Sequence, residues 1–336
     1  MNLSSYFKPK TMVYTGKHVK TPTSIKHYAY DAKTLLVSAD FKSNKDLKNY
    51  IQIVGLSNVQ EIAIIKEHYN IDPLILEDVF NVNQRNKIEV VENSLFGAFH
   101  VEYLENNYVK EDYMSILMIE NTIITFHETE PVFLKPLDTL FNDHKELREK
   151  SIDYLLYQIL DIITDNHLDV YDELDLAISL FEEEIIDTKN IEQEDFYLVR
   201  KNMLKLKNNV TPIYEQLEKI LLKNQDLFNS SNKLYYEDLK DHLQRLDSRI
   251  NQAREVMRNL LDLHMNNQSN KMNKIMATLT LFSAIFIPLS FLTGFFGMNF
   301  VHFGILQYNQ AVLIFSILCF TIAIAMVLFF KKKKWF

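Results

Sequence analysis

The stretch Ile275–Phe296, IMATLTLFSAIFIPLSFLTGFF, decides how this chain is built, because it runs for 22 residues without a charged side chain. A second stretch, Ala311–Phe330, AVLIFSILCFTIAIAMVLFF, adds 20 more uncharged residues. A helix needs about 20 apolar residues to cross roughly 30 Å of hydrocarbon. One such run alone could be the core helix of a soluble protein. Two of them, followed by the lysine run Lys331–Lys334, predict two membrane-spanning helices.

The positions of the lysines predict the orientation of these spans. Lys271 and Lys274 precede the first span and Lys331–Lys334 follow the second, whereas the connection 297–310 contains no Lys or Arg. The positive-inside rule then places both lysine-bearing ends in the cytoplasm and the connection outside. Because Met1–Lys10 lacks the apolar run of a signal peptide, we expect the large N-terminal part to stay in the cytoplasm.

Charge is divided unevenly along the 336 residues, whose formal net charge is −8. Residues 1–262 hold all 44 acidic and 30 of the 36 basic residues, a net charge of −14, whereas the remaining 74 residues carry +6. Binding of nucleic acid by the soluble part would need the opposite sign, so we expect no nucleic-acid partner. The single cysteine, Cys319, excludes an intrachain disulfide and a cysteine-built zinc site.

The sequence offers no glycine-rich phosphate loop and no pairing of a nucleophile with a base. We therefore expect neither an enzyme nor an organic cofactor. His100 and His127 fall in β-rich runs, and we interpret them as strand residues rather than metal ligands.

Residues 1–130 predict a cytoplasmic α/β domain with two helices, Val59–Tyr69 and Pro73–Phe80, the second with proline in its first turn. Runs rich in β-branched and aromatic residues predict the strands Met12–Tyr14, Thr34–Val37, Tyr50–Val54, Ile88–Val91, Phe96–Tyr103 and Met114–Phe126.

Residues 131–274 predict a cytoplasmic stalk of long helices, because no glycine occurs between Gly97 and Gly294. A first helix is expected from about Pro136 to Asp187 and a second from about Glu192 to Leu222. A turn and cap at Asn229–Ser231 should precede a third.

The third helix carries apolar residues at alternating steps of four and three, the spacing of a coiled-coil-like seam. These residues are Leu239, Leu243, Leu246, Ile250, Ala253, Met257 and Leu260. No proline or glycine separates the seam from the first span, which predicts one helix from about Tyr235 to Phe296, 62 residues or roughly 93 Å. The alternative is a break in the polar segment Asn266–Asn270.

One face of the first span is less apolar than the rest. Mostly small or polar residues follow each other there at steps of three or four, in the set Asn273, Met276, Thr280, Ser283, Ile287, Ser290 and Gly294. Such a stripe either lines a water-filled path or packs closely against another helix, and periodicity does not separate the two. Two helices cannot enclose a path, so a pore requires several copies of the chain. The second span has no such stripe, which favours an outer, lipid-facing helix.

The stripe holds amide and hydroxyl oxygens but no carboxylate. Neutral oxygens can accept hydrogen bonds from the water shell of a cation without removing that shell, and Mg²⁺ gives up its waters reluctantly. Entry would need no ATP, because a divalent cation gains about 4.6 kcal/mol per 100 mV of inside-negative potential.

The residues after the first span resemble a known family. Gly297-Met298-Asn299 resembles the signature of the CorA family of magnesium transporters, and it follows Ile287-Pro288-Leu289-Ser290-Phe291. The terminal Lys331-Lys332-Lys333-Lys334-Trp335-Phe336 and the run from Pro73 to Arg85 are also similar to that family. The resemblance covers nearly the whole chain. It implies a funnel-shaped homopentamer in the inner membrane of a prokaryote, in contact with lipid, that admits Mg²⁺ and related divalent cations such as Co²⁺.

The resemblance also implies roles for particular residues. The side-chain oxygen of Asn299 would meet the hydrated ion at the outer mouth, and Asn273 would form the inner polar ring. The remaining path would comprise Gly297, Met298, Ser290, Ile287, Thr280, Leu279 and Met276. At the cytoplasmic mouth, Lys331, Lys332, Lys333 and Lys334 would repel cations unless offset by Asp262.

Regulation in the resembling family uses intracellular Mg²⁺ held between subunits by carboxylates. The matching residues are Asp78 and Asp238, with Glu77, Asp161 and His242 as members of a second, adjacent site. A bound divalent ion reverses the repulsion between carboxylates, so its loss would separate the interfaces and open the pore. For any single Asp the simpler interpretation is a solvated charge.

One departure affects the substrate. Many members of the resembling family carry an acidic residue soon after the signature, whereas 300–310 contains none, so cations should concentrate less at the outer mouth. Zinc, cobalt or nickel transport remains an alternative, and so does a membrane-anchored metal sensor or scaffold whose spans only oligomerise.

Overall fold

The computed structural model describes residues 13–42, 44–106, 108–187, 191–298, 304 and 309–333. The chain forms two compact units, Met1–Arg258 and Asn259–Phe336. Helix α7 belongs to both, with its first part in one unit and its last part in the other.

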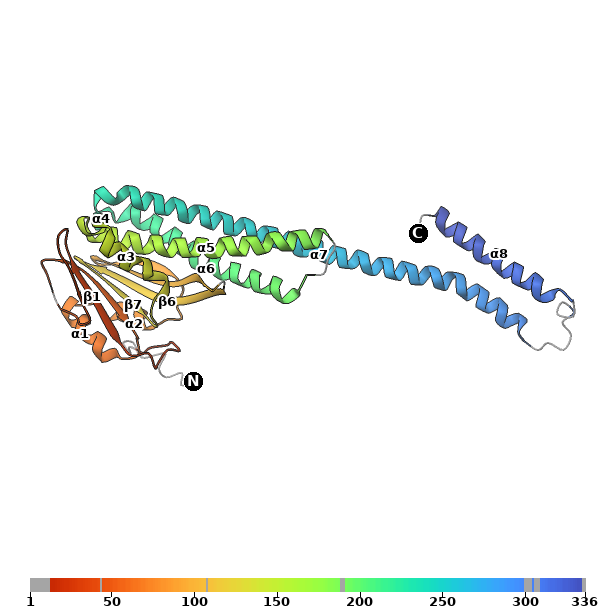
Figure 1. The fold of residues 1–336 in the computed structure, drawn as a ribbon, viewed down its shortest axis with the longest axis horizontal. Coiled ribbons are helices and arrows are strands. Elements are labelled where there is room, and N and C mark those ends of the chain that lie inside the picture. The colour runs from red at the N-terminus through yellow and green to blue at the C-terminus, as the bar shows by residue number, and fades with distance from the viewer. Residues whose placement is uncertain are drawn as a thin grey trace. The chain divides into compact units, whose positions relative to one another are not determined.

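The first unit contains a seven-stranded sheet in the order β2-β1-β3-β7-β6-β5-β4 (Figure 1). Its strands are β1 Ser24–Tyr30, β2 Leu35–Ser38, β3 Lys48–Val54, β4 Lys87–Val91, β5 Ser94–Glu105, β6 Tyr108–Ile119 and β7 Thr122–His127. All neighbours are antiparallel except β3 and β7, which run parallel at the centre. The chain between these two strands supplies the crossover that a parallel pair requires.

Helices α1 Val59–Tyr69 and α2 Pro73–Phe80 lie in this crossover and cover one face of the sheet (Figure 1). Asp72 caps α2 by accepting a hydrogen bond from the backbone N–H of Leu74 at 2.7 Å, and Pro73 pre-sets the first turn. Buried side chains of both helices pack against the sheet in one apolar core, which includes Ile62, Ile65, Ile75, Leu76, Val79, Phe80, Phe96, Leu117, Ile124 and Phe126.

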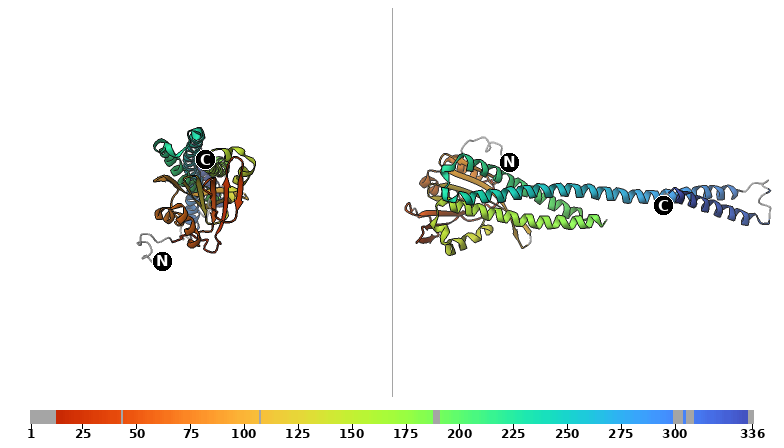
Figure 2. Two further views of the ribbon diagram at one scale, coloured as in Figure 1. Left: turned by 90° about the vertical axis from the view of Figure 1, so that its left-hand side faces the viewer. Right: turned by 90° about the horizontal axis from the view of Figure 1, so that it is seen from above.

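Long helices cover the opposite face and the β4 edge (Figures 1 and 2). Short elements lead into them: the 3-10 turn η2 Val132–Leu134 and the helices α3 Lys135–Asp143 and α4 Lys145–Glu149. Helix α5, Ile152–Ile186, packs on β5, and α6, Gln193–Lys223, packs beside β4. The side chain of Gln216 on α6 accepts a hydrogen bond from the N–H of Ile88, so α6 occupies the open edge of β4.

The start of α7, Lys233–Phe296, is fastened to the start of α5. After the 3-10 turns η3 Gln225–Leu227 and η4 Ser230–Asn232, the carboxylate of Asp153 accepts hydrogen bonds from the Asn229 N–H and the Asn232 amide, each at 3.0 Å. The Tyr236 hydroxyl donates to the Asp153 carbonyl at 2.6 Å. Within the first unit, the predicted seam of α7 is buried, with exposed fractions from 0% at Leu243 to 4% at Ala253. These contacts bind the first part of α7 to the helical layer.

The second unit consists of the last part of α7 and the helix α8, Ala311–Lys332, which runs back in the opposite direction (Figures 1 and 2). Both helices are long and apolar enough to cross a membrane, with mean hydropathies of 2.1 and 2.9 over their most apolar windows. Phe296 and Phe315 meet at 5.1 Å between ring centroids. Half-buried or buried positions of α8 recur at steps of three or four, at Ala311, Phe315, Cys319, Ile322, Met326 and Phe330, so one stripe of α8 faces α7.

Several elements confirm the expectations from sequence. Helices α1 and α2 begin and end where predicted, α7 is continuous through Asn266–Asn270, and His100 and His127 lie in β5 and β7.

Others correct them. Val13 and Tyr14 are not in a strand, and β1 was missed. The run Met114–Phe126 is a hairpin rather than one strand, because the backbone turns at Glu120 with φ 49°. The region Pro136–Asp187 is three helices, since the chain becomes extended at His144 and again at Lys150.

Candidate functional site

The predicted stripe and the packing against α8 lie on opposite faces of α7. Between Leu281 and Phe296, the half-buried or buried residues of α7 are Leu281, Ala284, Ile285, Pro288, Leu289, Leu292 and Phe296. All seven stripe residues, Asn273, Met276, Thr280, Ser283, Ile287, Ser290 and Gly294, are exposed in the single chain. At 100° per residue, Phe296 lies about 180° around the helix from Ile287. The stripe is therefore left uncovered by the chain's own second span.

Two threonine hydroxyl groups on this part of α7, one of them on the stripe, donate to carbonyl groups of the same helix. The Thr280 hydroxyl donates to the Met276 carbonyl at 2.8 Å, and the Thr293 hydroxyl donates to the Ser290 carbonyl at 3.0 Å. With the proton used inside the helix, the oxygen keeps its lone pairs for an outside donor. Such an oxygen can accept a hydrogen bond from the water shell of a cation.

Helix α7 ends at the predicted signature. The Gly297 N–H donates to the Thr293 carbonyl at 2.9 Å and the Met298 N–H to the Phe295 carbonyl at 3.3 Å, so both residues continue the last turn. Met298 is 57% exposed. Asn299, the residue expected to meet the ion first, lies outside the described residues.

At the other end of the second unit, the structure places Leu279 and Met276 on α7 with exposed fractions of 66% and 51%. Asp262 is exposed on α7, and Lys331, Lys332 and Lys333 are exposed at the end of α8. Among the described residues, Asp262 forms no ion pair with these three lysines, and Lys334 lies outside the described range.

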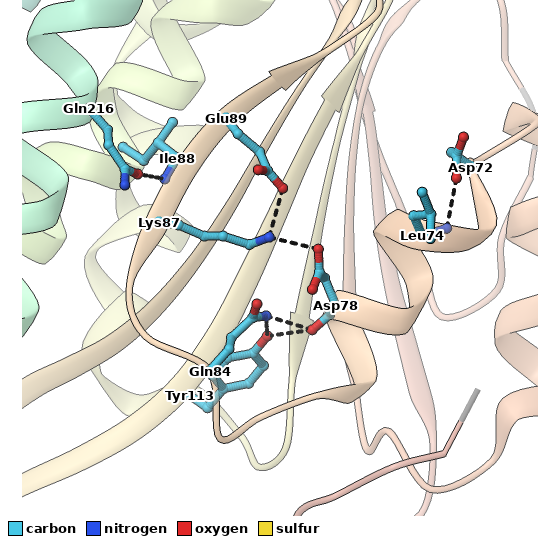
Figure 3. A network of polar contacts seen from close by, with 9 residues as sticks. All are labelled: Asp72, Leu74, Asp78, Gln84, Lys87, Ile88, Glu89, Tyr113 and Gln216. Carbon is cyan, nitrogen blue, oxygen red and sulfur yellow. Dashed lines mark hydrogen bonds and ion pairs between the residues drawn. The ribbon is translucent and has the colours of Figure 1, made fainter. Parts of the chain in front are cut away.

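Asp78 is held in a polar network between α2 and β4 (Figure 3). Its Oδ2 atom is 2.7 Å from the Lys87 ammonium, which is also 2.7 Å from the Glu89 Oε1 atom. Its backbone carbonyl accepts hydrogen bonds from the Gln84 amide at 2.7 Å and the Tyr113 hydroxyl at 3.2 Å. Burial lowers the pKa of Lys87, but the bonds to Asp78 and Glu89 outweigh burial and raise it above its ordinary value.

A second group of charges lies where α5 meets the start of α7. His242 Nε2 is 3.7 Å from Asp238 Oδ1, one turn away on α7. Burial raises the pKa of Asp161 on α5, and the nearby Asp165 raises it further, while His242 acts in the opposite direction. Burial also raises the pKa of Asp165. The structure thus brings Asp161, Asp238 and His242 together within one chain.

The structure does not assemble a complete metal site within one chain. Among the described residues, no group of three or more His, Cys, Asp or Glu side chains could hold a metal ion. Asp78 has Lys87 as its ionic partner, and Glu77 is exposed on the outer side of α2. Mg²⁺ usually keeps several waters and is bound by only one or two carboxylates, so the lack of such a group does not by itself exclude Mg²⁺ at these positions.

Comparison with known proteins identifies the family. The profile described as CorA-like Mg²⁺ transporter protein matches residues 49–332. The chain belongs to this family. A cobalt/magnesium transport protein CorA from Thermotoga maritima is 27% identical over 337 residues, covering 97% of this chain and 96% of the relative. The zinc transport protein ZntB from Photorhabdus laumondii is 23% identical over 190 residues, covering 55% of this chain and 57% of the relative.

The CorA-like fold also appears in solved structures. The complete structure of the CorA magnesium transporter from Methanocaldococcus jannaschii matches with a TM-score of 0.78 at 20% identity, covering 94% of this chain and 99% of that one. The soluble domain of the same protein matches with a TM-score of 0.61 at 16% identity, covering 72% of this chain. An α/β domain, long helices and two apolar C-terminal helices are thus the shared architecture.

Sequence reasoning missed two residues of this CorA-like chain. Lys87 was not singled out, because the expected strand began at Ile88; with the strand begun one residue earlier, Lys87 and Glu89 alternate and so share a face. Asp153 was not singled out either, because its partners Asn229 and Asn232 lie 76 and 79 residues away in sequence.

Proposed function

We propose that this CorA-family protein is a homopentameric, channel-like transporter that admits Mg²⁺ into the cell. The observation that carries the proposal is the face of α7 opposite α8, which presents amide and hydroxyl oxygens and is exposed in the single chain. Identical faces from several copies would surround an axis and accept hydrogen bonds from a hydrated cation. Inside-negative potential supplies about 4.6 kcal/mol per 100 mV for a divalent ion, so flux needs no other energy source.

Gating is the second part of the proposal. Mg²⁺ on the cytoplasmic side would bind between neighbouring copies at Asp78 of one and Asp238 of the next, with Glu77, Asp161 and His242 at an adjacent position. The raised pKa of Asp161 supports this, because a carboxyl group that is crowded by burial and like charge gains most from an added cation. Loss of the ion would separate the interfaces and open the path.

The ion path is tested by substitutions in full-length protein reconstituted into liposomes. Ser290→Leu adds bulk and removes an oxygen on the stripe, so we expect Mg²⁺ flux at fixed potential to fall about tenfold, the effect of roughly 1.4 kcal/mol on the permeation barrier. Asn299→Ala is expected to lower flux at least as much. The matched control is Ser316→Leu, which changes an equally exposed serine on α8 and should leave flux intact.

The same liposomes separate the competing functions. Equal losses in both serine variants would remove the stripe from the path. Intact flux in Asn299→Ala would favour spans that only oligomerise a metal sensor. Flux of Zn²⁺, Co²⁺ or Ni²⁺ without flux of Mg²⁺ would overturn magnesium as the substrate.

A further inference from the structure

The carboxylate of Asp78, which is central to the proposed gate, already forms an ion pair with Lys87. The Lys87 ammonium lies 2.7 Å from Asp78 Oδ2 and 2.7 Å from Glu89 Oε1, and Figure 3 shows it between the two carboxylates. Only 20% of the Lys87 side chain is exposed, against 31% for Asp78. A cation that binds Asp78 from outside therefore meets a positive charge that is already in hydrogen-bond contact with it.

The position of Lys87 is set by the fold around it. Lys87 and Glu89 alternate on β4, which pairs with β5 in the register Lys87↔Ala98 and Glu89↔Phe96, so both side chains point to the face that α2 covers. The ammonium also lies 5.4 Å from the centroid of the buried Phe96 ring. The Lys87 side chain is thus held by its strand, by the ring of Phe96 and by Glu89. Its ion pair with Asp78 therefore costs little additional side-chain entropy.

The opposite side of the contact is equally fixed. The Asp72 cap and Pro73 begin α2, and Gln84 and Tyr113 both donate to the backbone carbonyl of Asp78. Among the described residues, Lys87 is the ion-pair partner of Asp78, and the second carboxylate oxygen, Oδ1, has no hydrogen-bond partner there. One oxygen is thus engaged and one is left for an incoming ligand.

We propose that Lys87 is a built-in competitor of the regulatory cation, and that it sets the Mg²⁺ concentration at which Asp78 becomes occupied. The inference rests on the proposed function, since it assumes that Asp78 binds cytoplasmic Mg²⁺. A divalent ion at Asp78 must either displace the ammonium from Oδ2 or bind beside it against Coulomb repulsion. In both cases the Lys87 ammonium raises the apparent dissociation constant of the divalent ion at Asp78. The factor is the same in every copy, because each chain carries one Lys87 beside its Asp78.

Removal of the ammonium provides the test. In full-length protein in detergent, Mg²⁺ is titrated while protection against a protease is followed, and in liposomes the internal Mg²⁺ that halves flux is measured. We expect Lys87→Met to lower both midpoints roughly fivefold, the change that a partly exposed ion pair of about 1 kcal/mol produces. The unbranched Met side chain is similar to lysine in shape and carries no charge.

The direction of the shift separates competition from structural damage, because a damaged site would bind Mg²⁺ more weakly. Lys87→Arg keeps the charge and should keep the wild-type midpoint. Lys26→Met, which breaks the 3.0 Å ion pair with Asp138 far along the sheet on β1, is the matched control and should change neither midpoint. If Lys87→Met misfolds, Lys87→Gln serves as the second variant with the same expected shift.

Each result bears on one proposal. A midpoint that is unchanged or raised in both Lys87→Met and Lys87→Gln overturns the competition, and so does an Asp78→Asn variant whose midpoint equals that of wild type. Absence of Mg²⁺ flux in wild type overturns the transport function alone, because the protease titration still reports whether Lys87 opposes Mg²⁺ at Asp78.

Discussion

At the scale of single residues, Glu102 is an acidic side chain that the fold buries. It is 1% exposed on β5, and it faces Glu111 across the strand pair. Burial, and after it the nearby Glu111, raise the pKa of Glu102 to about 8, against the opposing effects of Asn209 and Lys205 on α6. The side chain is therefore protonated in the folded protein at neutral pH.

This shift predicts a pH dependence of stability. Below about pH 4.5 the carboxyl group is protonated in both states, and between pH 4.5 and 8 only the folded state keeps the proton. The contribution of Glu102 to stability is thus lost as pH rises through this window, at most about 1.4 kcal/mol per pH unit. We expect Glu102→Gln to unfold at a higher temperature than wild type, with a difference that grows from pH 5 to pH 8.

The measurement is thermal unfolding of the full-length protein in detergent at several pH values. Glu130→Gln, which changes an exposed glutamate, is the control and should follow wild type throughout. A difference between Glu102→Gln and wild type that stays constant with pH would show that the carboxyl group does not titrate differently on folding.

At the scale of elements, the first part of α7 depends on its seam. Leu243 is fully buried in the seam, whereas Leu234, two to three turns earlier on the same helix, is 76% exposed. We expect Leu243→Ala to lower the free energy of unfolding by about 2–4 kcal/mol, because it removes buried methyl groups and leaves a cavity. Leu234→Ala should change it by less than about 0.5 kcal/mol. Denaturant unfolding of both variants checks this, and similar losses would place the seam elsewhere.

Local sequence patterns predicted the faces of α7, but they did not predict contacts between distant elements. The seam and the stripe followed from spacing alone, because a helix repeats every 3.6 residues and each face is read from one local stretch. The hairpin at Glu120 was missed because β6 and β7 are both apolar and no glycine or proline marks the turn. The pairing of Asp78 with Lys87 depends on a helix docking against a sheet edge, which no local pattern encodes.

The face of α7 that packs against α8 was also beyond local reading. Leu281, Ile285 and Leu292 are no more apolar than their neighbours, so only the docked second helix distinguishes them from lipid-facing positions. The carboxylates of the proposed gate came from resemblance rather than from spacing, because their partners are expected on another copy of the chain.

At the scale of the whole molecule, charge and hydropathy together predict how the chain sits in a membrane. Residues 1–262 carry −14 and the last 74 residues carry +6, and all six of the latter charges flank the two apolar helices. Lysines next to a span stay on the cytoplasmic side, whereas long acidic regions contribute little to orientation. We therefore propose that the N-terminal unit and the lysine run share the cytoplasm, and that the connection between α7 and α8 faces outward.

Cysteine accessibility tests this topology, because Cys319 is the only native cysteine and Cys319→Ser gives a background without thiols. In that background we expect Gln310→Cys, at the start of α8, to react with a membrane-impermeant maleimide on intact cells. Lys332→Cys, at the end of α8, and His144→Cys, exposed between α3 and α4, should react only after the membrane is permeabilised. Labelling of Lys332→Cys on intact cells would invert the second span and place the lysine run outside. Labelling of His144→Cys on intact cells would place the N-terminal unit outside, and the proposed gate would then lie on the side from which the inside-negative potential draws cations away.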